Sequence, residues 1–203
     1  MSETKPIIIR IWQAIQRRIR HQRILFFARR SSSAAISSVK QLDRVLVLCY
    51  GNIYRSPLVE YLLRRQLAGE KVELKSAGFH EKDGRSCVEE YLGLLSKRGY
   101  DLTAHRSSRV THDDIEWADV IVIMDRKNWD LMKQMDQSAI QKIIWVGGFT
   151  NNMSVEVVDP YGLGVEATEK VISQLEIGAG DIANKIVEKR SSLSSHIRVG
   201  GSA

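Results

Sequence analysis

Four short, mostly apolar segments of this chain are separated by stretches long enough to hold helices. Three of them are continuous apolar runs or nearly so, Val45 to Leu48, Val120 to Met124 and Lys142 to Val146, and Val72 to Ser76 is a weaker fourth. Runs of this length suit strands that are buried on both faces, as in parallel sheets. We therefore predict an α/β domain with a mainly parallel sheet, whose ligands would bind at the carboxyl ends of the strands.

Helical patterns occupy two of the remaining segments. Ser86 and Glu89 have the spacing of a capping box, and Gly99 would end the helix that follows. The apolar face of that helix comprises Val88, Tyr91, Leu92 and Leu95. A later helix, weakened by two glycines at 178 and 180, has an apolar face that comprises Val171, Leu175, Ile182 and Ile186.

The positive charge of the chain is confined to its N-terminus. Residues 1–42 hold nine Lys and Arg and one acid, Glu3, which gives a net charge of +8. The remaining 21 Lys and Arg face 23 acids, so the rest of the chain carries −2 and the whole chain +6. Because the body is close to neutral, we do not expect a nucleic-acid partner.

The basic N-terminus has a helical pattern of its own. Its apolar positions recur at roughly helical spacing and are Ile8, Trp12, Ile15, Ile19 and Phe26. The serine-rich stretch 31–38 that follows predicts a linker. We expect three parts: a basic N-terminal helical arm with its linker over residues 1–42, a domain over residues 43–191 and a flexible tail over residues 192–203.

Several roles are open for the arm. Residues 1–42 could lie on an anionic membrane surface or bind an acidic partner. An Arg-rich, Ser-rich and acid-poor N-terminus also fits an organellar transit peptide. A solvated extension without a specific partner is the remaining alternative.

Two cysteines, Cys49 and Cys87, are too few for a disulfide-rich secreted scaffold or for a four-cysteine zinc site. No cluster of histidines or acids predicts a metal site, and we expect neither a metal nor a cofactor. No apolar run approaches the length of about 18 residues typical of a membrane span, and the N-terminus lacks the features of a secretory signal. We therefore expect a reduced, cytoplasmic protein, with peripheral membrane contact through the arm left open.

The loop after the first strand has the pattern of an anion-binding site. From Cys49 to Pro57 it reads Cys-Tyr-Gly-Asn-Ile-Tyr-Arg-Ser-Pro, and a helical stretch follows from Leu58 to Leu67. Ser56 suits the N-cap of that helix and Pro57 its first position. The backbone N–H groups of the loop would then lie at the positive end of a helix dipole.

The residue types within this loop fit a phosphate. Gly51 and Asn52 tolerate the left-handed backbone that turns several N–H groups around one anion. Arg55 adds a planar fork that matches two phosphate oxygens. Cys49 would lie in the same positive field, which favours the thiolate form of a cysteine.

A thiolate beneath a bound phosphate can attack phosphorus and form a phosphocysteine. Ser56 could donate a hydrogen bond to the sulfur and make it a better leaving group in a second step. An acid for the departing alcohol is still needed, and Asp159, in the late segment Val157-Val158-Asp159-Pro160-Tyr161-Gly162, is the candidate. Pro160 biases Asp159 away from helical geometry.

These motifs together resemble the low-molecular-weight protein tyrosine phosphatase family, from about Val45 to Lys189. The strongest element is a cysteine, five residues and Arg-Ser-Pro directly after a strand, joined by the late Asp159-Pro160-Tyr161. The supporting segments are Ser76-Ala77-Gly78, Thr103-Ala104-His105 and Met124-Asp125.

The resemblance implies a four-stranded parallel sheet with helices on both faces and hydrolysis of phosphotyrosine in proteins. It implies Cys49 as nucleophile, Arg55 as phosphate binder and Asp159 as general acid. The other residues that it places around the phosphate and the substrate ring are Tyr50, Gly51, Asn52, Ile53, Tyr54, Ser56 and Tyr161, with His105 as a support of the loop.

Two departures from the family pattern leave alternatives open. Many members have a second cysteine before the arginine, where this chain has Tyr54, and the role of Cys87 is unassigned. One alternative is an arsenate reductase of the same fold, which would need further cysteines. The other is a module that binds phosphotyrosine without hydrolysing it.

Overall fold

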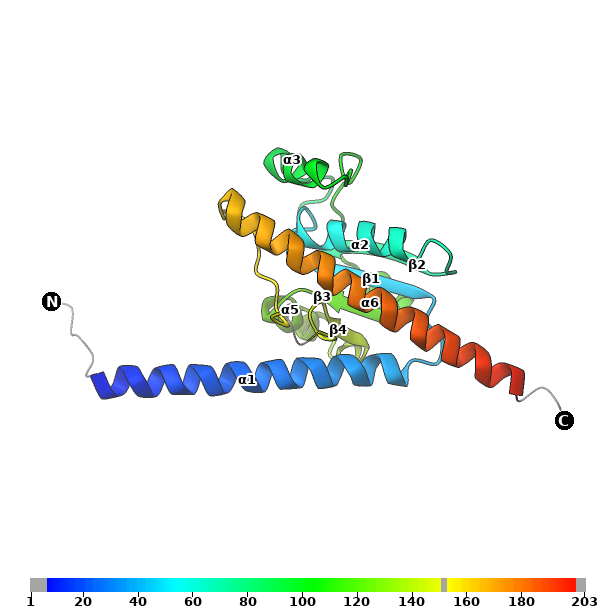
Figure 1. Cartoon of the computed structure of the whole chain (residues 1–203), viewed down its shortest axis with the longest axis horizontal. Coiled ribbons are helices and arrows are strands. Elements are labelled where there is room, and N and C mark those ends of the chain that lie inside the picture. The colour runs from blue at the N-terminus through cyan, green and yellow to red at the C-terminus, as the bar shows by residue number, and fades with distance from the viewer. Residues whose placement is uncertain (1–6, 151–152, 200–203) are drawn as a thin grey trace.

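The computed structural model describes residues 7–150 and 153–199, which form a parallel sheet with helices on both faces (Figure 1). The strands lie in the order β2-β1-β3-β4 and are β1 (Arg44–Cys49), β2 (Glu73–Gly78), β3 (Val120–Ile123) and β4 (Ile143–Trp145). The α-helices are α1 (Ile7–Ser38), α2 (Arg55–Gln66), α3 (Glu89–Lys97), α4 (His112–Trp117), α5 (Arg126–Met135) and α6 (Val165–Val199). A 3-10 helix, η1 (Ser138–Lys142), precedes β4. The predicted four-stranded parallel sheet is confirmed.

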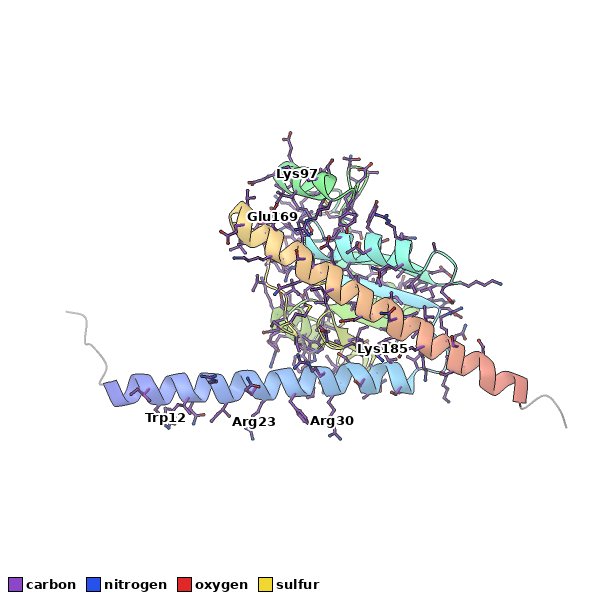
Figure 2. All side chains as sticks on the ribbon, in the orientation of Figure 1. Trp12, Arg23, Arg30, Lys97, Glu169 and Lys185 are labelled. Carbon is purple, nitrogen blue, oxygen red and sulfur yellow. The ribbon has the colours of Figure 1, made fainter. Side chains whose placement is uncertain are left out.

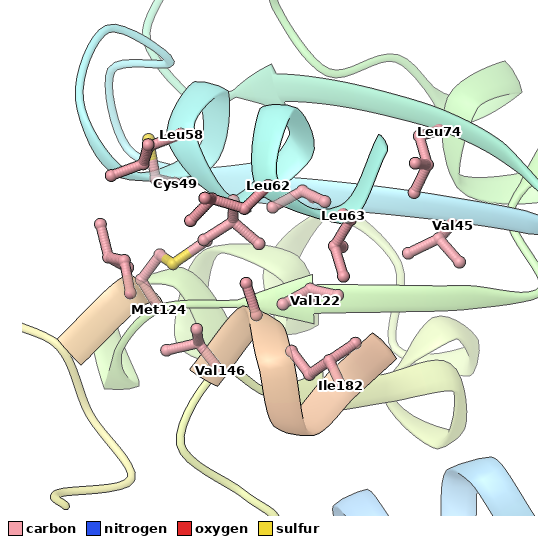
Figure 3. Packing of buried hydrophobic residues seen from close by; sticks show 14 of the residues in the cluster. Val45, Cys49, Leu58, Leu62, Leu63, Leu74, Val122, Met124, Val146 and Ile182 are labelled. Atoms are coloured by element: carbon pink, nitrogen blue, oxygen red, sulfur yellow. The ribbon is translucent and has the colours of Figure 1, made fainter. Parts of the chain in front are cut away.

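The two faces of the sheet are covered by different helices. Along β1, Val45 and Val47 pack with α2, α3 and α6 (Figure 3), whereas Leu46 and Leu48 pack with α4 and α5. Successive side chains of a strand point to opposite faces, so a strand covered on both sides must be apolar throughout. This explains why the strands appear in the sequence as continuous apolar runs.

Helix α1 continues without a break through the serine-rich stretch, so the predicted linker over residues 31–38 is wrong. The hydroxyls of Ser31 and Ser32 each donate to the carbonyl of Ala28, at 3.0 and 2.8 Å, and that of Ser38 donates to Ala35. Serine hydroxyls bonded to the preceding helical turn leave the helix intact. The small side chains of this stretch also let the helix approach the sheet closely.

The C-terminal part of α1 lies along the edge strand β4. Ala28, Ser32 and Ala35 share one face of the helix and are buried. The backbone N–H of Trp145 in β4 donates to the Ser32 hydroxyl at 2.9 Å, and Arg29 donates to the carbonyl of Thr150. An edge strand with unpaired N–H groups is prone to aggregation, and α1 covers this one.

The N-terminal part of α1 projects past the body (Figure 1). It extends on the side where β1 ends at Cys49 (Figures 1 and 3). The ring of Phe27 meets Trp129 of α5 with ring centroids 6.3 Å apart.

Helix α6 continues to Val199, which corrects the predicted flexible tail for residues 192–199; residues 200–203 lie outside the described part of the chain. Lys189 donates to the carbonyl of Ser37 at 2.8 Å, and Arg190 donates to that of Leu42 at 2.6 Å. Arg190 also pairs with Asp43. The end of α6 is thereby tied to the connection between α1 and β1.

The start of α3 also differs from the prediction. The helix begins at Glu89, and its N-cap residue, Val88, makes no side-chain capping bond, so the capping box of Ser86 and Glu89 does not form. The predicted end is confirmed: Gly99 follows the helix with a positive φ of 77°, and its N–H donates to the carbonyl of Ser96.

Gly178 in α6 is required by close packing against the end of β4. A Cβ atom at this position would lie 2.5 Å from the carbonyl oxygen of Val146, which is backbone and cannot move aside. At Gly180 in the same helix, the nearest atom to such a Cβ is the side-chain nitrogen of Gln66, 4.0 Å away. The two glycines therefore form a matched pair with different packing.

We expect Gly178→Ala to lower the free energy of unfolding by about 1–3 kcal/mol, because the added methyl overpacks the contact with β4. Gly180→Ala should raise it by about 0.5–1 kcal/mol through the better helix propensity of alanine. Urea unfolding followed by circular dichroism measures both. Equal effects of the two substitutions would contradict the packing described for Gly178.

Candidate active site

The phosphate loop, defined here as residues 49–55, connects the end of β1 to the start of α2. Helix α2 begins at Arg55 with Tyr54 as N-cap residue, so the predicted N-cap at Ser56 is wrong by two residues. Pro57 still lies in the first turn, where a backbone N–H has no partner within the helix. The loop therefore turns directly into the helix, as an anion site at a helix N-terminus requires.

Asn52 is central to the shape of this loop. Its φ of 50° is the positive value that the sequence predicted for this turn. Its side-chain amide donates to the hydroxyls of Ser56 at 2.9 Å and Ser76 at 3.0 Å. Its side-chain oxygen accepts the N–H of Ser108 at 2.9 Å. Buried in this network, Asn52 ties the loop to β2 and to the segment before α4.

The thiol of Cys49 lies at the base of the loop and accepts two hydrogen bonds. The backbone N–H of Asn52 donates to Sγ at 3.2 Å, and the hydroxyl of Ser56 donates to it at 3.1 Å. Bonds to the charged form of a group favour that form, so both donors stabilise a thiolate. The structure thus brings together the cysteine and the serine that the sequence singled out.

The end of β2 and the segment that follows it support the loop. A Cβ atom at Gly78 would lie 2.8 Å from the carbonyl oxygen of Tyr50, so only glycine fits beneath the loop. The N–H of His80 donates to that same carbonyl at 2.9 Å, and Arg85 donates to the carbonyl of Gly51 at 2.5 Å. These contacts hold the loop in place.

His105 lies against the same loop. Its ring nitrogen Nε2 is 2.8 Å from the carbonyl oxygen of Asn52, and because a carbonyl only accepts, Nε2 carries the proton. The contact agrees with the supporting position that the resemblance implied.

Arg55 is almost fully buried, with 1% of its side chain exposed, and its guanidinium is held by acidic and carbonyl oxygens. One terminal nitrogen donates to Asp125 at 2.5 Å and to the carbonyl of Val157 at 2.9 Å. The other donates to Asp159 at 2.7 Å. Asp125 is also the N-cap of α5. Its contact with Arg55 was not predicted.

Two properties of Arg55 suit an oxyanion. Burial alone would lower the pKa of its guanidinium, but the negative charges of Cys49, Asp125 and Asp159 outweigh burial and raise it. Its Nε is buried and has no hydrogen-bond partner among the described residues. An unpaired buried donor is costly, and a phosphate oxygen would satisfy it.

A cavity of about 450 Å³ opens above the thiol. Seven of the predicted site residues line it, namely Cys49, Tyr50, Gly51, Ile53, Tyr54, Asp159 and Tyr161. Three more residues line it that sequence reasoning missed, His80, Arg85 and Lys127. The ammonium of Lys127 lies 3.5 Å from the centre of the Tyr50 ring. The position of Lys127 just after a strand is a signal that could have found it, since parallel strands gather ligands at their carboxyl ends.

Tyr54 packs against Tyr91 of α3. The hydroxyl of Tyr91 donates to the carbonyl of Tyr54 at 3.0 Å, and the two rings meet with centroids 4.9 Å apart. Cys87 is buried, and burial, followed by the charge of Cys49, raises the pKa of its thiol to about 11. Cys87 is therefore protonated at neutral pH.

The cavity above the Cys49 thiol, with an arginine and an acid beside it, can bind a phosphate and act on it.

Within the described ranges, none of the helices has the length and apolarity needed to cross a membrane.

Comparison with known proteins agrees with this geometry. The model of the low molecular weight phosphotyrosine protein phosphatase family matches residues 44–192. The probable low molecular weight protein-tyrosine-phosphatase AmsI of Erwinia amylovora is 32% identical over 145 residues, covering 71% of this chain and 98% of that protein. Its crystal structure superposes with a TM-score of 0.65 at 31% identity, covering 71% of this chain and 93% of that one.

A second relative is named for a different substrate, phosphorylated arginine. A protein-arginine-phosphatase of Geobacillus stearothermophilus is 30% identical over 144 residues, covering 70% of this chain and 95% of that protein. The structure of the YwlE arginine phosphatase from this organism superposes with a TM-score of 0.67 at 26% identity, covering 74% of this chain and 96% of that one.

The family match begins at residue 44, so α1 lies outside it. It covers well over half of the chain, and the parallel sheet and the phosphate loop agree with it. The chain belongs to the low molecular weight phosphotyrosine protein phosphatase family.

Proposed function

We propose that this phosphatase hydrolyses phosphotyrosine in protein substrates through a phosphocysteine on Cys49, with Asp159 as general acid. The observation that carries the proposal is the position of the Cys49 thiol. It accepts hydrogen bonds from Asn52 and Ser56 at the start of a helix, in the same cavity that Asp159 lines. A thiol held in this way is a nucleophile poised beneath an anion site.

In the first step, the Cys49 thiolate attacks phosphorus in line with the bond to the phenolic oxygen. The S–P bond forms as the P–O bond to the tyrosine breaks. Asp159, protonated, donates its proton to the departing oxygen, so that tyrosine leaves as a neutral phenol. The N–H groups of the loop and the Arg55 guanidinium bind the phosphoryl oxygens.

In the second step, a water molecule attacks the phosphorus of the phosphocysteine. Asp159, now ionised, takes a proton from that water. The S–P bond breaks, phosphate is released and Cys49 returns as thiolate. The hydrogen bond from Ser56 to the sulfur, 3.1 Å long in the free enzyme, stabilises the leaving thiolate.

Arg55 must change partners when substrate binds. One of its nitrogens is bound to Asp159 at 2.7 Å. A phosphate with two negative charges would compete for that nitrogen and would also take the unpaired Nε. Asp159 would then be released toward the leaving group, while Asp125 keeps Arg55 in place.

The lining of the cavity favours an aromatic substrate. Tyr50, Tyr54 and Tyr161 contribute rings and Ile53 an aliphatic wall, which together suit the flat face of a phenol. A phosphorylated arginine would bring a guanidinium close to the cations Arg85 and Lys127, which line the same cavity. Asp159, the one carboxylate of this lining, is already paired with Arg55.

The substrate class is tested with two peptides of the same sequence, one carrying phosphotyrosine and the other phosphoarginine. We expect kcat/KM to be at least about a hundredfold higher for the phosphotyrosine peptide, because like charges placed together cost several kcal/mol. Comparable values would assign the arginine-phosphatase activity instead.

For the nucleophile, we expect Cys49→Ser to abolish hydrolysis of an aryl phosphate, because a serine hydroxyl at this position is not ionised at neutral pH. Cys87→Ala is the matched control and should keep the activity, since the Cys87 thiol takes no part in the steps above. The wild type should hydrolyse the substrate in the presence of a chelator and be inhibited by vanadate. Activity that survives Cys49→Ser would overturn the mechanism.

For the acid, we expect Asp159→Asn to lower kcat by about 10²- to 10⁴-fold, the usual contribution of general acid–base catalysis. The loss should shrink for aryl phosphates whose phenols are acidic, because such leaving groups need no proton. Steady-state kinetics on a series of substituted aryl phosphates measures this dependence. A loss that is equal across the series would mean that Asp159 acts only by holding Arg55.

For oxidation, we expect peroxide to inactivate the enzyme with little recovery in dithiothreitol. Peroxide oxidises a sulfenic acid on Cys49 further, to irreversible products, unless a nearby thiol first captures it as a disulfide. Cys87 is protonated and buried, and Tyr54 carries no sulfur, so neither residue is suited to capture it. Tyr54→Cys should restore recovery, because residue 54 lines the same cavity as Cys49. A reducing compartment such as the cytoplasm would protect Cys49, in keeping with the location expected from the sequence.

The assay is residual activity after peroxide and then reductant, with mass spectrometry of the cysteines. Full recovery of the wild type together with a disulfide between Cys49 and Cys87 would contradict this prediction.

A further inference from the structure

Helix α1 carries a stripe of exposed apolar side chains, the outer stripe, made of Trp12, Ile15, Ile19 and Phe26. Between 48% and 68% of each of these side chains is exposed. At 100° per residue the four fall within one narrow sector of the helix. The side chain of Ile8, which the sequence pattern placed in the same stripe, lies outside the described part of the chain.

The outer stripe faces away from the phosphatase body. The face of α1 that packs on the body holds Ala28, Ser32 and Ala35, about half a turn around the helix from the stripe. Figure 2 shows Trp12, Arg23 and Arg30 projecting from the side of α1 opposite the body. From Trp12 to Phe26 the stripe is about 21 Å long at 1.5 Å per residue.

Arginines flank this stripe. Arg18, Arg23 and Arg30 are exposed: Arg18 lies on one side of the stripe, Arg23 borders it on the other side, and Arg30 continues its line one turn beyond Phe26. The sequence of α1 contains seven arginines and no aspartate or glutamate. An apolar stripe bordered by cations is the pattern of a helix that lies flat in the interface of an anionic membrane.

The same features argue against other occupants. A second copy of the helix would bring arginine rows against arginine rows, and like charges oppose such a contact. An acidic protein would pair with the arginines but would leave unexplained an apolar line this long on one side of a helix. Trp12 suits a lipid interface, where indole rings with one polar edge gather.

We propose that the outer stripe of α1 docks on an anionic lipid surface, with the helix lying parallel to that surface. The apolar side chains enter the boundary between headgroups and acyl chains, and the flanking arginines bind lipid phosphates. Because the other face of α1 is bonded to β4, docking holds the phosphatase body at the membrane.

The test is co-sedimentation of the full chain with vesicles of phosphatidylcholine and phosphatidylserine. The full chain is needed because Ala35 and Ile36 belong to the core, so removing α1 would disturb the body. We expect binding to the mixed vesicles and little binding to pure phosphatidylcholine.

The apolar part of the proposal is tested with Ile15→Gln combined with Ile19→Gln. We expect at least about tenfold weaker vesicle binding, because two buried aliphatic side chains are lost from the lipid contact. The matched control is Ile177→Gln combined with Val187→Gln, two exposed apolar residues of α6, and it should bind as the wild type does.

The charged part is tested with Arg23→Gln combined with Arg30→Gln. Since each cation near an anionic surface contributes about 1 kcal/mol, we expect roughly thirtyfold weaker binding. Lys71→Gln combined with Lys97→Gln removes the same charge from other exposed positions and should change binding little. Circular dichroism of all four variants checks that the fold is retained.

Equal vesicle binding of the stripe variant and the wild type would overturn the proposal. A lack of vesicle binding by the wild type would overturn it as well. Binding of polyglutamate by that chain would then indicate an acidic protein partner. A dimer that the stripe variant loses would indicate contact with a second copy.

Discussion

A buried guanidinium determines the arrangement of the active site. Arg55 is removed from water, and a buried charge is tolerated only when oxygens surround it. Those oxygens come from Asp125 at the end of β3 and from Val157 and Asp159 in the late loop. One side chain of the phosphate loop thus ties together three segments that are far apart in the sequence.

The sequence predicted the sheet, and it singled out residues that the structure brings together around one cavity, because both depend on local patterns. Apolar runs identified the strands, and the spacing from Cys49 to Pro57 identified the phosphate loop. Two contacts could not be predicted from a local pattern, because each joins residues that are distant in the chain. They are the contact of Arg55 with Asp125 and that of Lys127 with Tyr50. The start of α2 was misplaced because Ser56, a good capping residue, bonds instead to Cys49.

The N-terminal segment shows how composition can mislead. Serines and alanines suggested a linker, but small side chains are what allow α1 to lie close to β4. Gly178, which weakened the predicted last helix, is likewise needed for close approach of α6 to Val146. In α1 and in α6, residues that seemed unsuited to a packed helix are explained by a tertiary contact with β4 or the residue after it. The result is a phosphatase domain to which one long helix is fixed through its C-terminal part.

Transfer of the phosphoryl group to Cys49 is the central claim, and trapping that group tests it most directly. Asp159→Asn should be mixed with an aryl phosphate whose phenol leaves easily, quenched during turnover, digested and analysed by mass spectrometry. The first step then proceeds while the second, which needs Asp159 as base, is slowed. The account predicts a phosphoryl group on the peptide that contains Cys49. Release of the phenol with no phosphorylated Cys49 at any time would contradict it.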